Sequence, residues 1–198
     1  MRHLLFTFVV AALLVGCAKE ESVLPTQREK IEQYLQTRHR PALIPVEQVE
    51  EGSDLDTYYT TAGSTVYRYI WNVNNPDRLN QAEVTPSSSV WLTFQIYPFD
   101  SYNNIPSTQL PLYTNDASLR EAYIEEGLNI DEWKFVPQLI NLSQEDILPG
   151  LRYALIGCRS GDVVEAYMTS NMAYGDMLFS LLPKECPLYI YFEVGGVN

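Results

Sequence analysis

The side chains that most often perform acid–base and nucleophilic chemistry are scarce in this chain. Among its 198 residues only His3 and His39 are histidines. Its three cysteines, Cys17, Cys158 and Cys186, lie far apart and show no metal-ligand spacing. We therefore do not expect a Ser-His-Asp triad, an imidazole proton shuttle or a histidine-based zinc site, and we expect no cofactor and no metal ion.

Carboxylates, in contrast, are abundant. The chain has 25 Asp and Glu against 13 Lys and Arg, a formal net charge of −12. Such an acidic surface repels phosphate backbones, which argues against a nucleic-acid partner. Neighbouring acids such as Glu125–Glu126 and Asp131–Glu132 lack calcium-loop spacing, and we interpret them as solvated faces rather than as a glycosidase pair.

Cys17 follows a segment typical of a secretory leader. A weakly positive start precedes the apolar run Leu4–Leu14, which is shorter than the roughly 20 residues of a transmembrane helix. The run ends in Leu-Val-Gly-Cys, which resembles the lipobox of bacterial lipoproteins, where the cysteine is acylated and becomes the mature N-terminus. We expect a signal peptide over residues 1–16 and lipidation of Cys17. The alternative is a secreted protein with a chance cysteine.

The residues after Cys17 favour the outer membrane of the cell envelope. Ala18 is not the aspartate that suggests inner-membrane retention in enteric bacteria. Lys19–Glu21 is similar to the surface-export signals of lipoproteins in one Gram-negative phylum, although a solvated acidic tether fits equally well. The expected contact with the membrane is through N-terminal acyl chains such as palmitate, which contribute about 0.8 kcal/mol per buried CH₂.

The elements that must position any site are mostly strands joined by turns. The spacing of Ile31, Tyr34 and Leu35 predicts an amphipathic helix over 26–38, capped near Thr26 or Gln27, and residues 52–63 are polar and typical of turns. This order, without an internal repeat, predicts an antiparallel α+β domain. Strands are predicted over 65–73, 90–96, 133–142, 162–169 and 188–194, and short helices over 116–126 and 150–157.

The last third of the chain carries the most specific pattern. Its pieces occur in the order Ile147–Leu151, Gly157–Asp162, Ser170–Gly175, Leu181–Pro183 and Leu188–Val194. This succession resembles the FKBP-type peptidyl-prolyl isomerases, whose signature runs approximately V-I-x-G-W, G-M-x-x-G-E/D, P-x-x-A-Y-G, I-P-P and L-x-F-x-V-x-L. From residue 147 to residue 175 the match needs no gap.

The resemblance implies an FKBP-like twisted antiparallel sheet wrapped around the short helix at 150–157. Upstream, 89–96 looks like the family's strand V-x-V-x-Y-x-G. Residues 64–198 would form this domain, with a helical insertion at 116–126. Residues 17–63 would supply a tether and an added N-terminal helix.

The resemblance also implies a chemistry that needs no acid, base, nucleophile or metal. Rotation about an X-Pro amide bond has a barrier of about 18–20 kcal/mol because the C–N bond has partial double-bond character. An apolar cleft removes the water that stabilises the planar amide, and so favours the twisted state. The implied activity is that of a rotamase, and the implied partners are proline-containing segments of envelope proteins.

Carried over position by position, the resemblance gives seven cleft residues. Ile147 and Leu148 would line the cleft, with the backbone N–H of Leu148 donating to a substrate carbonyl, and Tyr174 would offer its hydroxyl to the same peptide. Four further side chains would form walls and floor: Phe94, Leu151, Leu182 and Ile190.

The chain also departs from the family at the cleft. The family's floor tryptophan is Leu151, its inner-strand phenylalanine is Ile190, its tyrosine is Phe94, and another aromatic falls near Gln138. Two segments, Phe99–Asp100 and Tyr113–Thr114, compete for the position of its Phe-Asp element, so the cleft acid falls at Asp100 or near Thr114. Because aromatic walls supply large contact area, we expect isomerase activity to be weak or lost.

Two questions stay open at this level. In the first hypothesis the domain binds proline-containing segments, with or without isomerising them. In the second it is a non-enzymatic surface lipoprotein that uses the scaffold to bind a protein or a glycan. Cys158 and Cys186 either form a disulfide, which an oxidising envelope permits, or remain free with Cys158 buried.

Overall fold

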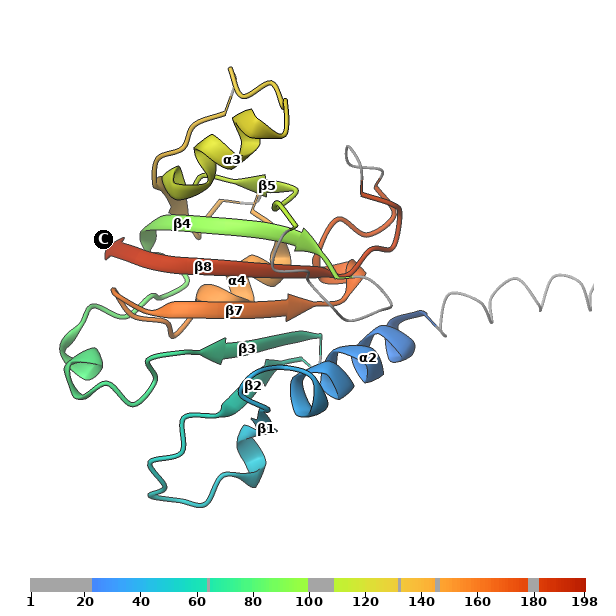
Figure 1. The fold of residues 1–198 in the computed structure, drawn as a ribbon. Coiled ribbons are helices and arrows are strands. Elements are labelled where there is room, and N and C mark those ends of the chain that lie inside the picture. The colour runs from blue at the N-terminus through green and yellow to red at the C-terminus, as the bar shows by residue number, and fades with distance from the viewer. Residues whose placement is uncertain (1–22, 64, 100–108, 132, 145–146, 178–181) are drawn as a thin grey trace, which may run out of the picture.

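The fold is built on one sheet. The computed structural model describes residues 23–63, 65–99, 109–131, 133–144, 147–177 and 182–198. Within these residues the sheet has 8 strands in the order β1-β2-β3-β7-β8-β4-β5, and β6 also pairs with β4 (Figure 1). Every pairing is antiparallel except that of β1 with β2. The strands are β1 Ile44–Pro45, β2 Tyr58–Ala62, β3 Val66–Ile70, β4 Ser89–Pro98, β5 Tyr113–Thr114, β6 Gln138–Asn141, β7 Val163–Met168 and β8 Leu188–Val197.

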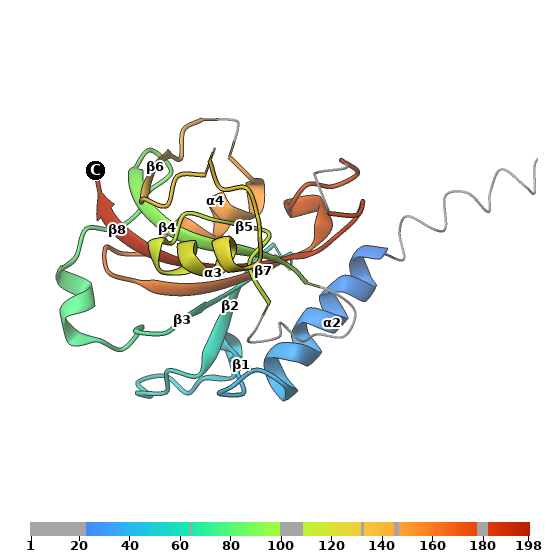
Figure 2. The same ribbon diagram turned by 45° about the horizontal axis from the view of Figure 1, so that its top comes forward.

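Helices lie on both faces of this sheet. Figure 2 shows α2 (Val23–Thr37) and α4 (Pro149–Leu155) on opposite sides of it, and Figure 1 shows α3 (Arg120–Glu125) beyond β5. Four short 3₁₀ helices complete the elements: η1 Val46–Gln48, η2 Pro76–Asn80, η3 Ala117–Leu119 and η4 Ser170–Met172. The predicted α+β class, the antiparallel sheet around a short helix and the added N-terminal helix are therefore confirmed.

The inner core lies between the sheet and α4. Strand β4 alternates so that Leu92, Phe94 and Ile96 point inward, opposite alternate residues of β8. The inward residues of β8, from Leu188 to Val194, are at most 2% exposed. This two-residue periodicity is what the sequence shows, and it explains why both strands could be predicted.

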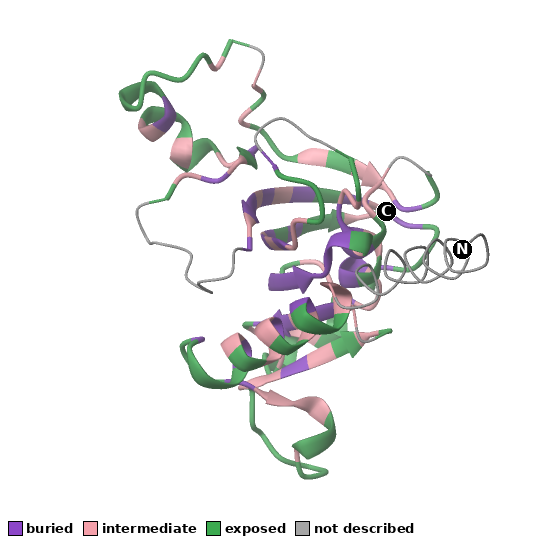
Figure 3. Ribbon diagram, turned by 90° about the vertical axis from the view of Figure 1, so that its right-hand side faces the viewer, coloured by how far each residue is buried: buried purple, intermediate pink, exposed green. Residues whose placement is uncertain are grey.

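A second, smaller core lies on the other face of the sheet, which we call the outer face. Ile31 and Leu35 of α2 are fully buried and pack with Tyr67 of β3 and Tyr167 of β7. Each such aliphatic side chain contributes about 1.5–3 kcal/mol on burial. Strand β7 is therefore buried on both faces, and in Figure 3 the buried residues follow the sheet while α2 exposes its far side.

Residues 52–63, predicted as a turn-rich segment, contain β2. Its sequence Tyr-Tyr-Thr-Thr-Ala has no apolar–polar alternation, and Tyr59 alone of its five residues is buried, at 3% exposure. Pairing with β3 therefore makes this strand, and no pattern in its own residues predicts it. Strand β2 ends at Ala62 and pairs with β3, which begins at Val66. We predicted a domain boundary between residues 63 and 64, and that division of the chain stays a prediction.

Other elements also differ in extent from the sequence prediction. The strand predicted over 133–142 is confined to Gln138–Asn141, because Pro137 has no N–H and the Trp133 and Phe135 rings pack against Tyr123, 4.8 and 5.9 Å away. Helix α2 begins at Val23, before the predicted cap. Gln27 is buried within it, where its side chain donates to the Glu185 carbonyl (2.8 Å) and accepts from the Ser170 N–H (2.9 Å).

Two further findings bear on the anchor and the thiols. Within the described residues, no helix combines the length and the apolar character that crossing a bilayer requires. Cys158 and Cys186 are both free thiols, and burial raises the pKa of Cys158 to about 11. Cys17 and the signal-peptide segment lie outside the described residues.

Candidate functional site

A cavity of about 300 Å³ opens on the inner face of the sheet, beside the start of α4. It collects side chains from β4, β5, β6, β8, α4 and the turn after η4. The structure brings together six of the seven residues that the sequence placed in the cleft: Phe94, Ile147, Leu148, Leu151, Tyr174 and Ile190. We call this cavity the inner cleft.

Leu182 is the seventh, and it does not line the inner cleft. Its side chain is 2% exposed and belongs to the same hydrophobic core as Leu151 and Ile190. It therefore supports the walls from behind.

The start of α4 places Ile147 and Leu148 at the inner cleft. Leu148 is the N-cap residue, with an extended ψ of 127°, and Pro149 occupies the first helical turn, where its missing N–H costs nothing. The Leu148 carbonyl accepts the first helical hydrogen bond from the Arg152 N–H, at 3.1 Å. The chain thus turns sharply from the lining segment into the helix.

Gly150 lets α4 approach the sheet. A Cβ at this position would contact the Met168 side chain and lie 2.8 Å from the Met172 carbonyl oxygen. Packing therefore requires the glycine of the FKBP-like motif at this position. The close approach of α4 that it allows places Leu148 and Leu151 at the inner cleft.

Tyr174 is placed by a hydrogen-bonded turn. Gly175 has a φ of 57°, which glycine adopts without strain, and its N–H donates to the Ser170 carbonyl at 2.8 Å. Burial, and then the nearby Tyr113, raise the pKa of Tyr174, so its hydroxyl keeps its proton and can donate a hydrogen bond.

Tyr113 is a lining residue to which the sequence analysis gave no role. Strand β5 pairs with β4, so that Tyr113 lies opposite Ile96 and Thr114 opposite Gln95. The Tyr113 ring lies 5.6 Å from the Phe94 ring. The sequence did hold a signal for it, because Tyr113–Thr114 was one of the two segments that could correspond to the Phe-Asp element of the FKBP family.

The structure places the Tyr113–Thr114 segment beside Phe94. The Thr114 hydroxyl donates to the Phe94 carbonyl at 2.6 Å, and the Asn115 side chain accepts from the Phe94 N–H at 2.7 Å. Phe99 lies instead in the smaller core on the outer face, and Asp100 lies outside the described residues. Among the described lining residues none is acidic.

The remaining lining is aliphatic or amide. Ile96 is the next inward residue of β4 after Phe94, so the alternation could have predicted it. Gln138, where the family carries an aromatic, lies in the lining, and its amide approaches the Tyr113 hydroxyl at 3.5 Å. Residues that sequence reasoning did not place there come from β6 and the chain after it: Leu139, Ile140, Asn141 and Gln144.

This composition limits what the inner cleft can do. Its described lining has no histidine, cysteine, carboxylate, lysine or arginine, and the described part of the chain has no cluster of metal-ligating side chains. It can bind an apolar group, remove water from it and offer hydrogen bonds from Tyr174, Tyr113 and the amides.

Comparisons with known proteins support the fold. No family model and no curated protein matches the chain. The three FKBP domains of wheat FKBP73 match with a TM-score of 0.50 and 12% identity, over 71% of this chain and 51% of that structure. The N-terminal domain of FKBP42 from Arabidopsis thaliana gives 0.48 and 15%, over 76% of this chain and 99% of that one. A multi-domain immunophilin from Arabidopsis thaliana matches with a TM-score of 0.48 and 16% identity, over 74% of this chain and 47% of that structure.

The chain thus spans about half the length of the wheat protein and of the multi-domain immunophilin. Identity this low bears on the fold alone. The sheet wrapped around α4, the ordered motifs from residue 147 to residue 194 and the wheat match agree with one another. The chain has a divergent FKBP-like fold.

Proposed function

We propose that this protein is a lipid-anchored protein of the bacterial cell envelope that binds proline-containing segments of other envelope proteins in the inner cleft and isomerises their X-Pro bonds weakly. One observation carries the proposed binding of proline in the inner cleft. Six residues chosen from the FKBP motifs, spread from residue 94 to residue 190, line a single cavity.

The physical basis is desolvation. Phe94, Leu151 and Ile190 provide an apolar floor and walls for a pyrrolidine ring. The Tyr174 hydroxyl and the Leu148 N–H would hold the peptide on either side of the amide. Removing water from the amide favours its less polar, twisted state, which lowers the barrier without proton transfer.

Weak catalysis follows from the same lining. The floor is Leu151 rather than tryptophan, and Gln138 and Ile190 replace two aromatic walls of the family pattern. Smaller walls bury less of the proline ring, and each Å² of apolar surface left unburied forfeits about 25 cal/mol. A binding protein without measurable isomerase activity is the second candidate, favoured by the absence of a carboxylate from the described lining.

A protease-coupled assay on succinyl-Ala-Leu-Pro-Phe p-nitroanilide tests catalysis. We expect an isomerisation rate above the uncatalysed rate by no more than about tenfold, or roughly 1.4 kcal/mol of barrier. Leu148→Lys places a charge in the inner cleft and should abolish that increase. Leu79→Lys, at a side chain that is 73% exposed and outside the cleft lining, is the matched control and should not change it.

Binding has a separate readout. The Trp133 ring lies 5.5 Å from the Tyr113 ring in the cleft wall, so its fluorescence should respond to an occupied cleft. A saturable change that Leu148→Lys removes, together with no rate increase, selects the second candidate. No change with any X-Pro peptide contradicts both candidates.

The anchor is tested at Cys17. Helix α2 begins at Val23, six residues further along, so a lipid on Cys17 would hold the domain close to the membrane surface. Cys17→Ala should abolish palmitate labelling and move the protein to the soluble fraction, whereas Cys186→Ala should do neither. Unchanged fractionation of Cys17→Ala would contradict the anchor.

A further inference from the structure

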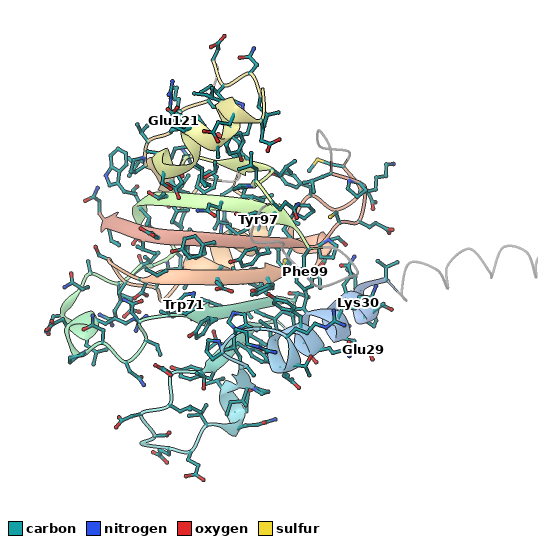
Figure 4. The ribbon with its side chains drawn as sticks, viewed as in Figure 1. Glu29, Lys30, Trp71, Tyr97, Phe99 and Glu121 are labelled. Carbon is teal, nitrogen blue, oxygen red and sulfur yellow. The ribbon has the colours of Figure 1, made fainter. Side chains whose placement is uncertain are left out.

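The outer face of the sheet carries a row of tyrosines that crosses four strands. The strand register aligns Tyr97 of β4 with Tyr189 of β8, then Tyr167 of β7 and Tyr67 of β3. Helix α2 covers the β3 and β7 end of this row, where Tyr67 and Tyr167 are buried. Figure 4 shows Tyr97 at the other end of the row and Trp71 beside β7 and β3.

A cavity of about 510 Å³ lies over the part of the row that α2 leaves open, and we call it the outer cavity. Tyrosines of β4 and β8 line one side of it, and the end of α2 with the residues after it lines the other. The volume lies within the range of small-molecule sites, about 300–1,000 Å³. None of its described lining residues belongs to the inner cleft.

Hydrogen bonds fix the polar groups of the outer cavity in place. The Tyr97 hydroxyl donates to Gln95 Oε1 and Gln95 Nε2 donates to Asp116 Oδ2, both at 2.8 Å. The Tyr191 hydroxyl donates to Glu193 Oε1 at 3.1 Å. The Tyr97 and Tyr189 rings lie 5.5 Å apart with an interplanar angle of 32°. The aromatic and polar groups are thus held in position before any ligand arrives, which lowers the entropic cost of binding.

The charges that line the outer cavity balance. Arg38, His39 and Arg40 face three carboxylates, those of Asp116, Glu165 and Glu193. His39 counts as a cation because Nδ1 lies 2.5 Å from the Pro41 carbonyl oxygen and Nε2 lies 2.9 Å from Glu165 Oε2, so both nitrogens face acceptors. A ligand that matches this lining is neutral and has both donors and acceptors on all sides.

We propose that the outer cavity binds a neutral carbohydrate chain. The partly exposed rings of Tyr189 and Tyr191 offer surfaces against which the C–H face of a sugar ring can pack. Each sugar hydroxyl both donates and accepts, as the amide of Gln95, the carboxylates and the arginines require. A proline-rich peptide fits less well, because this lining is largely polar and charged.

A second cavity extends the site along the sheet and favours a chain over a single sugar. It has a volume of about 570 Å³ and shares Glu193 with the outer cavity. Its lining includes Trp91, a large aromatic side chain that is 43% exposed on the outer side of β4. Successive sugar rings of a bound chain would lie along β8 and β4, against Tyr191, Glu193 and Trp91.

Calorimetric titration with cellohexaose, maltohexaose, xylohexaose and chitohexaose tests the proposal on the whole protein. We expect at least one hexasaccharide to bind with a dissociation constant below about 1 mM. Tyr191→Ala should weaken that binding at least about tenfold, roughly 1.4 kcal/mol. Tyr153→Ala, at a tyrosine of α4 that is 51% exposed, removes the same side chain elsewhere and should leave binding unchanged.

Three results would overturn the proposal. They are the binding of none of the four hexasaccharides, equal binding by wild type and Tyr191→Ala, and binding of anionic polygalacturonate or a proline-rich peptide alone. Thermal melts of both variants show whether a loss reflects unfolding. Because the outer cavity and the inner cleft share no described lining residue, failure of one proposal leaves the other standing.

Discussion

His39 Nε2 lies 2.9 Å from Glu165 Oε2, and this ion pair joins the chain just after α2 to the middle of β7. The two side chains are 4% and 9% exposed. Glu165 also accepts hydrogen bonds from Trp71 Nε1 at 3.0 Å and from the Tyr167 hydroxyl at 2.6 Å. One buried carboxylate thus organises the end of the N-terminal helix, the end of β3 and the outer tyrosine row.

The pair predicts a pH-dependent stability. Burial alone would lower the pKa of His39. The hydrogen bond to Glu165 and the charge of Glu165 raise this pKa by more than burial lowers it, so the net pKa lies above the ordinary 6.5. A histidine whose pKa is raised by folding stabilises the fold fully below the unfolded pKa, and this stabilisation is lost as pH rises through the folded pKa. Urea unfolding of wild type should therefore show a loss of stability from mildly acidic to alkaline pH.

His39→Gln should remove most of that pH dependence. It should also lower the free energy of unfolding by about 3 kcal/mol at mildly acidic pH, because Glu165 loses its buried ionic partner. A His39→Gln protein with the wild-type pH profile would show that the pair does not titrate as described.

Replacing Asp162, which belongs to the FKBP-like motif, should lower the free energy of unfolding substantially. It is 0% exposed, and it accepts from Arg78 Nε (2.7 Å), Arg78 Nη2 (2.8 Å) and the Arg159 N–H (2.7 Å). Asp162→Ala leaves these donors without their partner and should cost about 3 kcal/mol in urea unfolding. Asp131→Ala, at an exposed aspartate, should change the stability by less than about 0.5 kcal/mol. Equal stabilities of the two variants would contradict the role of Asp162.

Gly150→Ala should destabilise the fold although alanine is the better helix former. The propensity gain is about 1 kcal/mol, whereas the added Cβ would displace Met168 or the Met172 carbonyl at a cost that overpacking puts at about 1–3 kcal/mol. Gly196→Ala is the matched control, since its Cβ would meet the Trp91 side chain only at 3.4 Å. Thermal melting decides: a raised Tm for Gly150→Ala would mean that α4 can move away from the sheet freely.

Leu151→Trp should improve proline binding by restoring the aromatic floor. We expect binding of an X-Pro peptide to tighten about fivefold, or roughly 1 kcal/mol, with a parallel rise in isomerisation rate. Leu79→Trp adds the same ring at an exposed site outside the cleft lining and should change neither. A folded Leu151→Trp protein with weaker binding would show that proline does not contact this floor.

The C-terminal third could be predicted from the sequence because its signals are local. Strand β8 alternates, Pro149 starts α4 and Gly175 takes a positive φ, so pattern and structure coincide there. Five of the predicted residues that line the inner cleft, all but Phe94, lie in this third, on motifs that are short and ordered along the chain.

The rest depends on contacts between distant segments. Strand β2 exists through its pairing with β3, and Gln27 is buried because Ser170 and Glu185 lie beside it. Tyr113 enters the cleft only through pairing of β5 with β4. No periodicity in the sequence reports such partners, and the outer cavity, assembled from α2, β4, β7 and β8, could not be foreseen either.

The central claim is that the inner cleft binds an X-Pro peptide, and amide chemical shifts measured during a titration test it most directly. With increasing succinyl-Ala-Leu-Pro-Phe p-nitroanilide, we predict saturable shifts centred on Phe94, Leu148 and Tyr174, absent in Leu148→Lys. Shifts confined to other parts of the chain, or none at all, would contradict the claim.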